Sequence, residues 1–256
     1  MTLFEALILG VVEGVTEFLP ISSTGHLILV SSLLKIPSTE FLKSFEIAIQ
    51  LGAILAVVAL YWKSLFDIET IKKLIVGFLP TAIIGFLLYG IVKTYLLGNN
   101  VIVLIALALG GVALIAFEYF HTPAQHGTDS VPPITYRQAF FVGLFQSIAI
   151  IPGVSRSAAT IVGGLLLGIN RITIVEYSFL LAIPTMGAAT VLDLTKNASL
   201  FSQDQALALG LGFVTAFVVA LASIRFLLAY VRNHSFAAFG VYRIVIAAIF
   251  FWYFFL

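Results

Sequence analysis

The chain has 256 residues, of which 61% are hydrophobic and only 10% are charged, and its formal net charge is +1. Soluble domains are nearer half apolar and a quarter charged, so this composition indicates an integral membrane protein. The small net charge predicts no nucleic-acid partner. The absence of cysteine excludes disulfides, thiolate metal sites and cysteine nucleophiles.

The first apolar segment is interrupted before it is long enough to cross a membrane. A helical span needs about 20 predominantly apolar residues, whereas the segments 2–18 and 22–34 are each shorter. Pro20 cannot continue a helix, and it disfavours helical geometry at Leu19. We therefore predict a re-entrant helical hairpin whose tip lies within the membrane, where broken backbone must be buried in protein or line a cavity.

The remaining apolar segments predict six full spans and a second interrupted segment. The six spans are 45–62, 75–92, 101–120, 174–193, 205–230 and 239–256. The second interruption, Ile151–Ser157, lies within the stretch 138–169 and contains Pro152 and Gly153. We expect an all-α polytopic membrane protein that forms one domain over 1–256, with six transmembrane helices and two re-entrant hairpins.

The two halves of the chain resemble each other on either side of a polar linker, 121–136. The matching positions are Gly10 with Gly143 and Ile21 with Val154, 133 residues apart, and Phe45 with Phe179 and Thr81 with Thr215, 134 residues apart. This spacing predicts internal repeats of approximately 1–120 and 137–256. Each half holds one hairpin, which returns to its starting side, and three spans, so the repeats are predicted to be inverted. Paired interrupted segments in such repeats indicate a binding site near the midplane.

The basic residues of the predicted loops give the orientation. One set of loops carries Lys63, Lys72, Lys73, Arg137, Arg171 and Arg232, and the opposite set carries Lys35, Lys43, Lys93 and Lys196. Cytoplasmic loops carry an excess of Lys and Arg, so the first set is predicted to be cytoplasmic. Both termini are then outside, and the first hairpin enters from the outside while the second enters from the cytoplasm.

Polar residues are concentrated at the first interruption. They are Glu13, Glu17, Ser22, Ser23, Thr24 and His26. Ionisable groups at membrane depth are costly to hold there, so their clustering predicts a functional site. Glu13 and Glu17 are four residues apart and share one helix face. The hydroxyl residues are favoured helix caps, and the helix that they open also offers free N–H groups to an anion.

The second interruption repeats this pattern with a basic residue. Gly153 belongs to the turn, Ser155 and Ser157 supply hydroxyls, and Arg156 supplies a planar fork suited to phosphate oxygens. Two half-helix N-termini that meet tip to tip suit a diphosphate. The repeat is asymmetric here, since Glu13 matches Gln146 and Ser23 matches Arg156. Such asymmetry favours an enzyme over a symmetric carrier.

The two motifs together are specific enough to compare with a known family. Residues 13–26, EGVTEFLPISSTGH, and residues 152–160, PGVSRSAAT, resemble the two signatures of the bacterial undecaprenyl-diphosphatase family of the bacitracin-resistance type. Residues 45–55, FEIAIQLGAIL, resemble that family's first full span, and the resemblance extends essentially end to end. One departure, Ala158 where some members carry glycine, affects no candidate functional group.

The resemblance implies hydrolysis of undecaprenyl diphosphate to undecaprenyl phosphate and phosphate in the bacterial plasma membrane, which recycles the lipid carrier of cell-wall synthesis. It also implies a divalent cation, Mg²⁺ or Ca²⁺. By motif position, the implied catalytic residues are Glu17, Ser23, His26 and Arg156. The expected substrate-binding residues are Ser22, Thr24, Gly153, Ser155 and Ser157, and the expected metal ligands are Glu13 and Glu17, since magnesium is often held by one or two carboxylates together with substrate phosphates.

Several alternatives stay open at this stage. The nucleophile is Ser23, His26 or a water molecule. Inverted repeats and broken helices are also typical of transporters, so a flippase for a polyprenyl phosphate or another anion is the alternative function. The expected partners are the lipid substrate and membrane lipids, and a homodimer is left open. The outward entry of the first hairpin favours substrate access from the outer face.

Overall fold

The computed structural model describes residues 1–96, 99–121, 134–197 and 203–255, and within these residues the regular structure is entirely helical. The helices are α1 (Leu3–Thr16), α2 (Ser23–Leu33), α3 (Glu40–Tyr61), α4 (Ile68–Ile91), α5 (Asn100–Phe120), α6 (Tyr136–Gln146), α7 (Arg156–Leu166), α8 (Arg171–Asn197), α9 (Gln203–Val231) and α10 (Ala237–Phe255). Short 3₁₀ turns follow α3 and α6, and a π turn follows α4. The predicted all-α class is therefore confirmed, while most of the predicted linker, 121–136, lies outside the described residues.

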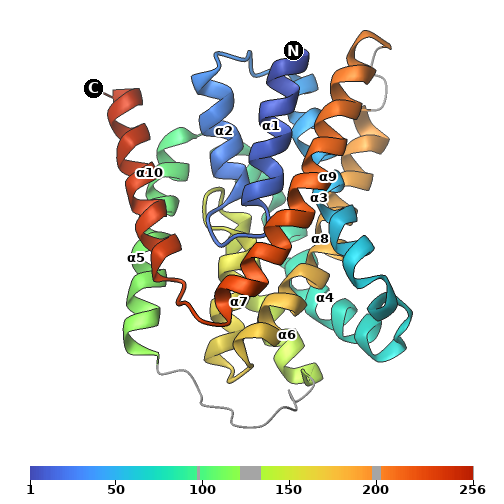
Figure 1. Ribbon diagram of the computed structural model, residues 1–256, viewed down its shortest axis with the longest axis vertical. Coiled ribbons are helices and arrows are strands. Elements are labelled where there is room, and N and C mark those ends of the chain that lie inside the picture. Colours follow the sequence, from blue (N-terminus) through green and yellow to red (C-terminus); the bar gives the residue numbers. More distant parts are fainter. Residues whose placement is uncertain (97–98, 122–133, 198–202, 256) are drawn as a thin grey trace.

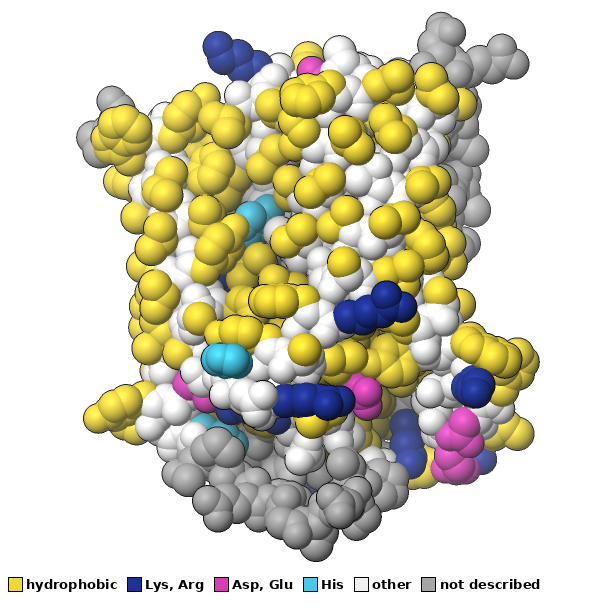
Figure 2. Space-filling view, viewed as in Figure 1, with side chains coloured by type: hydrophobic (Ala, Val, Ile, Leu, Met, Phe, Trp, Pro, Cys, Tyr) yellow, Lys and Arg dark blue, Asp and Glu magenta, His cyan; other side chains and the backbone are white. Residues whose placement is uncertain are grey.

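Five helical segments are long and apolar enough to cross a membrane among the residues described. They are Glu40–Phe66, Ile68–Leu88, Asn100–Phe120, Gln205–Val231 and Ala237–Phe255. Each coincides with a predicted span. The sixth predicted span, 174–193, lies within α8, which is not one of the five, and it stays a prediction. Figure 2 shows hydrophobic side chains over the side of the molecule, with most charged side chains of this face in its lower part.

The helical backbone is interrupted at both predicted places. α1 ends at Thr16 and α2 begins at Ser23, whereas α6 ends at Gln146 and α7 begins at Arg156. We call the non-helical residues 17–22 and 151–155 the first and second breaks. Figure 1 shows α1 and α2 in the upper half of the molecule and α6 and α7 in the lower half, so that the two breaks face each other near the middle. Their depth in a membrane stays a prediction.

The two half-helices that follow the breaks begin with the same unusual backbone conformation. Ser22 has φ 73° and Ser155 has φ 76°, a region that residues with a side chain rarely adopt. The Ser22 hydroxyl accepts a hydrogen bond from the Gly25 N–H (3.4 Å), and the Ser155 hydroxyl accepts one from the Ala158 N–H (3.2 Å). Each serine therefore caps its helix, as the sequence pattern predicted for these hydroxyl residues.

Packing around the breaks follows the pairing of the helices. α1 and α3 lie against α9, α6 lies against α4, and α5 lies against α10. The first break is buried, since Phe18 is 0% exposed and its ring meets Phe179 of α8 edge-on at 5.3 Å. α1 and α9 approach so closely that a Cβ added at Gly10 would lie 2.6 Å from the Gly212 carbonyl oxygen. The first break is thus enclosed by protein, which is the condition for such backbone at membrane depth.

Candidate active site

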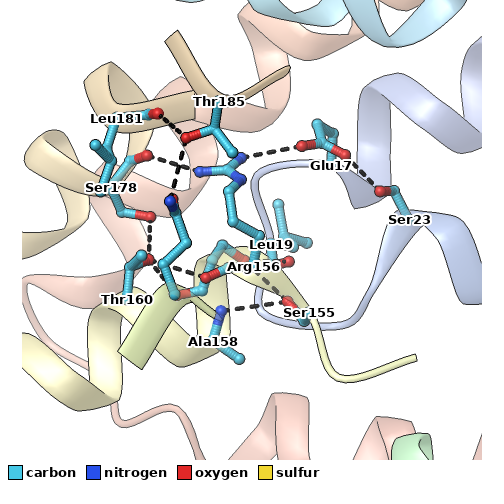
Figure 3. Close-up of polar contacts among 12 residues, drawn as sticks. Glu17, Leu19, Ser23, Ser155, Arg156, Ala158, Thr160, Ser178, Leu181 and Thr185 are labelled. Carbon is cyan, nitrogen blue, oxygen red and sulfur yellow. Dashed lines mark hydrogen bonds and ion pairs between the residues drawn. The ribbon is translucent and has the colours of Figure 1, made fainter. Parts of the chain in front are cut away.

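An ion pair joins the first break to the start of α7. Arg156 Nη2 donates to Glu17 Oε1 at 3.0 Å, and Arg156 Nη1 donates to the Ser178 carbonyl of α8 at 2.7 Å. The second oxygen of Glu17 accepts a hydrogen bond from the Ser23 hydroxyl. Figure 3 shows Glu17 between Arg156 on one side and Ser23 on the other. A carboxylate, a hydroxyl and a guanidinium from two distant parts of the chain therefore form one connected group.

A cavity of about 230 Å³ lies beside this group, between the two breaks. Seven of the sequence-predicted site residues line it, and they come from both breaks and from the first turns of α2 and α7: Glu17, Ser22, Ser23, Thr24, Gly153, Ser155 and Arg156. The other lining residues are Gln50, Thr81, Gln146, Ala149, Ile150, Ile151, Pro152, Thr185 and Met186. The structure thus brings the predicted acid, hydroxyl and arginine groups to a single cavity with polar and apolar walls.

His26 is predicted as catalytic, yet it does not line this cavity. Its Nδ1 lies 2.8 Å from the Ser22 carbonyl oxygen, and its Nε2 lies 2.9 Å from the Tyr242 hydroxyl on α10. A carbonyl oxygen only accepts hydrogen bonds, so Nδ1 carries the proton in this contact and Nε2 accepts from the tyrosine. Both ring nitrogens are therefore engaged, Nδ1 by the first break and Nε2 by α10, and the catalytic role of His26 stays a prediction.

Ser157 also lies outside the cavity lining. Its hydroxyl donates to the Leu19 carbonyl at 2.9 Å and lies 3.2 Å from the Ser155 hydroxyl. Leu19 belongs to the first break and Ser157 to α7, so this bond crosses between the two halves of the chain. The position of Ser157 indicates that it connects the breaks, and its predicted contact with substrate stays a prediction.

Glu13 is the residue whose surroundings bear on a metal ion. It is 0% exposed, and neither of its carboxylate oxygens has a hydrogen-bond partner. It lies outside the cavity lining, and the charged groups around it include Glu17, Glu46 and Arg156. Among the residues described, no group of three or more His, Cys, Asp or Glu side chains is placed to hold a metal alone. Two carboxylates that share a cation with substrate phosphates fit the way magnesium is commonly bound, and unpartnered oxygens on Glu13 agree with that arrangement.

One wall of the cavity is formed by polar residues that were not predicted as part of the site, namely Thr81, Gln146 and Thr185. Thr81 and Thr185 donate their hydroxyl protons to the Gly143 and Leu181 carbonyls at 2.9 and 2.8 Å. Both hydroxyls therefore accept from Gln146 Nε2, at 2.8 and 3.1 Å. This fixes the orientation of the amide and leaves Gln146 Oε1 buried without a partner. The available signal was a glutamine and two threonines within otherwise apolar helices.

Comparison with known proteins gives a consistent result over the whole chain. Residues 6–249 match the family described as bacitracin resistance protein BacA. The chain is 52% identical over 254 residues to a protein of Sulfurihydrogenibium sp. (strain YO3AOP1) named undecaprenyl-diphosphatase, covering 99% of this chain and 100% of the relative. Proteins with the same name from Persephonella marina and Aquifex aeolicus are 53% and 50% identical over 251 residues, with 98% of each chain covered.

Proposed function

The chain belongs to the bacitracin resistance protein BacA family, and from this membership we infer that it is a membrane enzyme that hydrolyses undecaprenyl diphosphate to undecaprenyl phosphate and inorganic phosphate. One observation carries this conclusion: over nearly its whole length, the chain is identical at about half of its positions to proteins named undecaprenyl-diphosphatase. The family and the activity predicted from the two sequence motifs are therefore confirmed. The transporter alternative is not favoured.

The proposed binding site for the diphosphate is the cavity between the breaks. Its volume of about 230 Å³ suits a headgroup, with the polyprenyl chain outside it. Arg156 offers a planar fork for phosphate oxygens, and its Nε is buried without a partner. α2 and α7 both begin at the wall of the cavity, where Ser22, Ser23 and Ser155 line it. Helix N-termini present N–H groups and a partial positive charge, which favour an anion.

Ser23 is the proposed nucleophile and Glu17 the proposed base. The Ser23 hydroxyl already donates to Glu17, which is the geometry of an activated nucleophile. Ser23 Oγ attacks the terminal phosphorus, its proton passes to Glu17, and the bond to the bridging oxygen breaks to release undecaprenyl phosphate. Water then hydrolyses the phosphoserine and restores the hydroxyl. Both His26 nitrogens are already engaged by Ser22 and Tyr242, and His26 does not line the cavity, which supports Ser23 over His26.

Glu13 and Glu17 are proposed to hold a divalent cation, Mg²⁺ or Ca²⁺, together with the substrate. When bound, the cation supplies positive charge that offsets the charge of the diphosphate. The chain's own contribution is the pair of neighbouring carboxylates, of which Glu13 has both oxygens unpartnered. Phosphoryl transfer depends mainly on positioning and charge stabilisation, and the residues around the cavity provide both.

The arrangement of the helices supports the proposed inverted repeat with two re-entrant hairpins. α1 with α2 and α6 with α7 extend from opposite ends of the molecule, and both termini lie at the end that holds α1 and α2 (Figure 1). Under the repeat, α1 corresponds to α6 and α9 to α4, and α1 packs on α9 as α6 packs on α4. The matching conformations of Ser22 and Ser155 agree with it. We place α8 as the sixth span and the termini outside the plasma membrane, with the cavity reached from the outer face.

Phosphate release by the purified protein in detergent tests this function. Wild-type protein is expected to release phosphate from a polyprenyl diphosphate, to lose the activity with a chelator, and to lose it in Glu17→Gln. Glu5→Gln is the matched control, because glutamine keeps the capping box at the start of α1. A flippase needs two compartments, whereas a phosphatase works without them. Absence of phosphate release by the wild type would refute the proposal.

A further inference from the structure

Arg243 of α10 is a buried cation that lies outside the proposed reaction. Its side chain is fully buried, at 0% exposed, and it does not line the cavity. All of its hydrogen bonds go to backbone carbonyl oxygens: Nε to Leu107 (3.2 Å), Nη1 to Pro20 (3.3 Å) and Val154 (3.0 Å), and Nη2 to Ala106 (3.0 Å) and Gly153 (2.9 Å). A guanidinium has five N–H donors, so one side chain engages five acceptors.

These acceptors show what the guanidinium connects. Pro20 belongs to the first break, Gly153 and Val154 belong to the second, and the remaining two carbonyls belong to α5. Non-helical carbonyls that are buried need hydrogen-bond partners, particularly away from water. Arg243 supplies partners to both breaks at once and fastens them to the same point on α5.

The packing of α5 against α10 leaves a path for this side chain. A Cβ added at Gly111 would lie 2.6 Å from the Gly240 carbonyl oxygen, so the two helices meet at glycines. A Cβ added at Gly110 would lie 2.7 Å from Arg243 Cζ, closer than real Cβ contacts come. Gly110 therefore leaves the space that the guanidinium crosses to reach the breaks.

We propose that Arg243 is a positioning residue that holds the two breaks in register, so that Ser23 and Arg156 face one diphosphate. The inference rests on the proposed function and adds a residue to it. A misplacement of 1 Å at a reacting centre costs about 10²-fold in rate, and the two half-helices reach the cavity from opposite ends of the fold. Lysine does not replace arginine here, because a compact ammonium with three donors cannot span five carbonyls.

The kinetic test compares perturbations of this contact made from two different helices. Arg243→Lys and Gly110→Ala are expected to lower kcat/KM for phosphate release by about 10²-fold, with KM raised as well as kcat lowered. Gly90→Ala in α4 is the control, since an added Cβ there meets nothing within 4 Å. The double variant Gly110→Ala/Arg243→Lys should lose no more than the worse single variant, because both changes remove one contact. A loss of folded protein alone would lower kcat and leave KM unchanged.

A distance measurement tests the same contact independently of activity. The chain contains no cysteine, so nitroxide labels attach only at Val15→Cys, two residues before the first break, and at Ile151→Cys, the first residue of the second break. These positions are 38% and 39% exposed. The label–label distance distribution should be narrow in the otherwise unchanged protein and in Gly90→Ala, and broad in Arg243→Lys and Gly110→Ala. Unchanged distances in both latter variants, or wild-type kcat/KM in Arg243→Lys, would overturn the proposal. If the wild type released no phosphate, the proposed function would fail while the distances still reported on Arg243.

Discussion

Arg156 and Glu17 form an ion pair of 3.0 Å across 139 residues of sequence, with their side chains only 11% and 5% exposed. The pair links the first break to the start of α7 at the wall of the cavity. Because the same carboxylate accepts the Ser23 hydroxyl, the arginine, the acid and the serine respond together to any change at one of them. This group is the basis for the first two predictions below.

Removal of the guanidinium should abolish most of the activity. Arg156→Ala is expected to lower kcat for phosphate release by about 10²- to 10³-fold, the usual loss when one group that stabilises transition-state charge is removed. Arg156→Lys keeps the charge without the planar fork, and its kcat should lie between that of the wild type and that of Arg156→Ala. Arg137→Ala, which removes an exposed arginine on α6, is the control. Wild-type kcat in Arg156→Ala would contradict the assignment of the clamp.

The identity of the nucleophile is tested at Ser23. Ser23→Ala should lower phosphate release by at least about 10²-fold, since it removes both the attacking oxygen and its contact with the base. Ser32→Ala, on the same helix, should leave the rate unchanged. A substrate labelled in its terminal phosphate should label the wild type transiently and leave Ser23→Ala unlabelled. Full activity in Ser23→Ala would instead support attack by water or by His26.

The requirement for a divalent cation should depend on Glu13. Glu13→Gln keeps the shape of the side chain and removes its charge, so the Mg²⁺ concentration needed for half-maximal phosphate release should rise at least about 10-fold. Glu5→Gln, on the exposed end of α1, should respond to Mg²⁺ as the wild type does. The same Mg²⁺ dependence in Glu13→Gln and in the wild type would exclude Glu13 as a ligand.

Replacement of the helix cap Ser155 should lower the stability more with alanine than with glycine. Ser155→Ala loses the hydrogen bond from the Ala158 N–H, which typically costs about 1 kcal/mol, and keeps the unfavourable φ of 76°. Ser155→Gly loses the same bond but relieves the backbone, whose strain in such a region is of order 1–3 kcal/mol. Thermal melting in detergent should therefore rank Ser155→Gly above Ser155→Ala. Equal melting temperatures would show that the backbone strain at this position is small.

The sequence by itself determined the helical class, the two interruptions and the family. The helical class and the interruptions depend on local chemistry, because Pro20 and Pro152 disfavour a continuous helix and because polar residues within apolar segments are costly in a membrane. Proline alone is not sufficient, since Pro80 and Pro184 lie inside α4 and α8. The N-caps at Ser22 and Ser155 follow from the same local rules. Seven of the sixteen residues that line the cavity are among the site residues predicted from the motifs around both breaks.

Only the tertiary structure decided which polar groups meet. His26 turns toward Tyr242, Ser157 bonds to Leu19, and Gln146 forms a cavity wall with two threonines. Arg243 is between 89 and 223 residues away in the sequence from the five carbonyls that it binds. The periodicity of a helix fixes which residues share a face. Which neighbour that face meets depends on packing between distant segments, and the spacing of residues along the chain does not encode it.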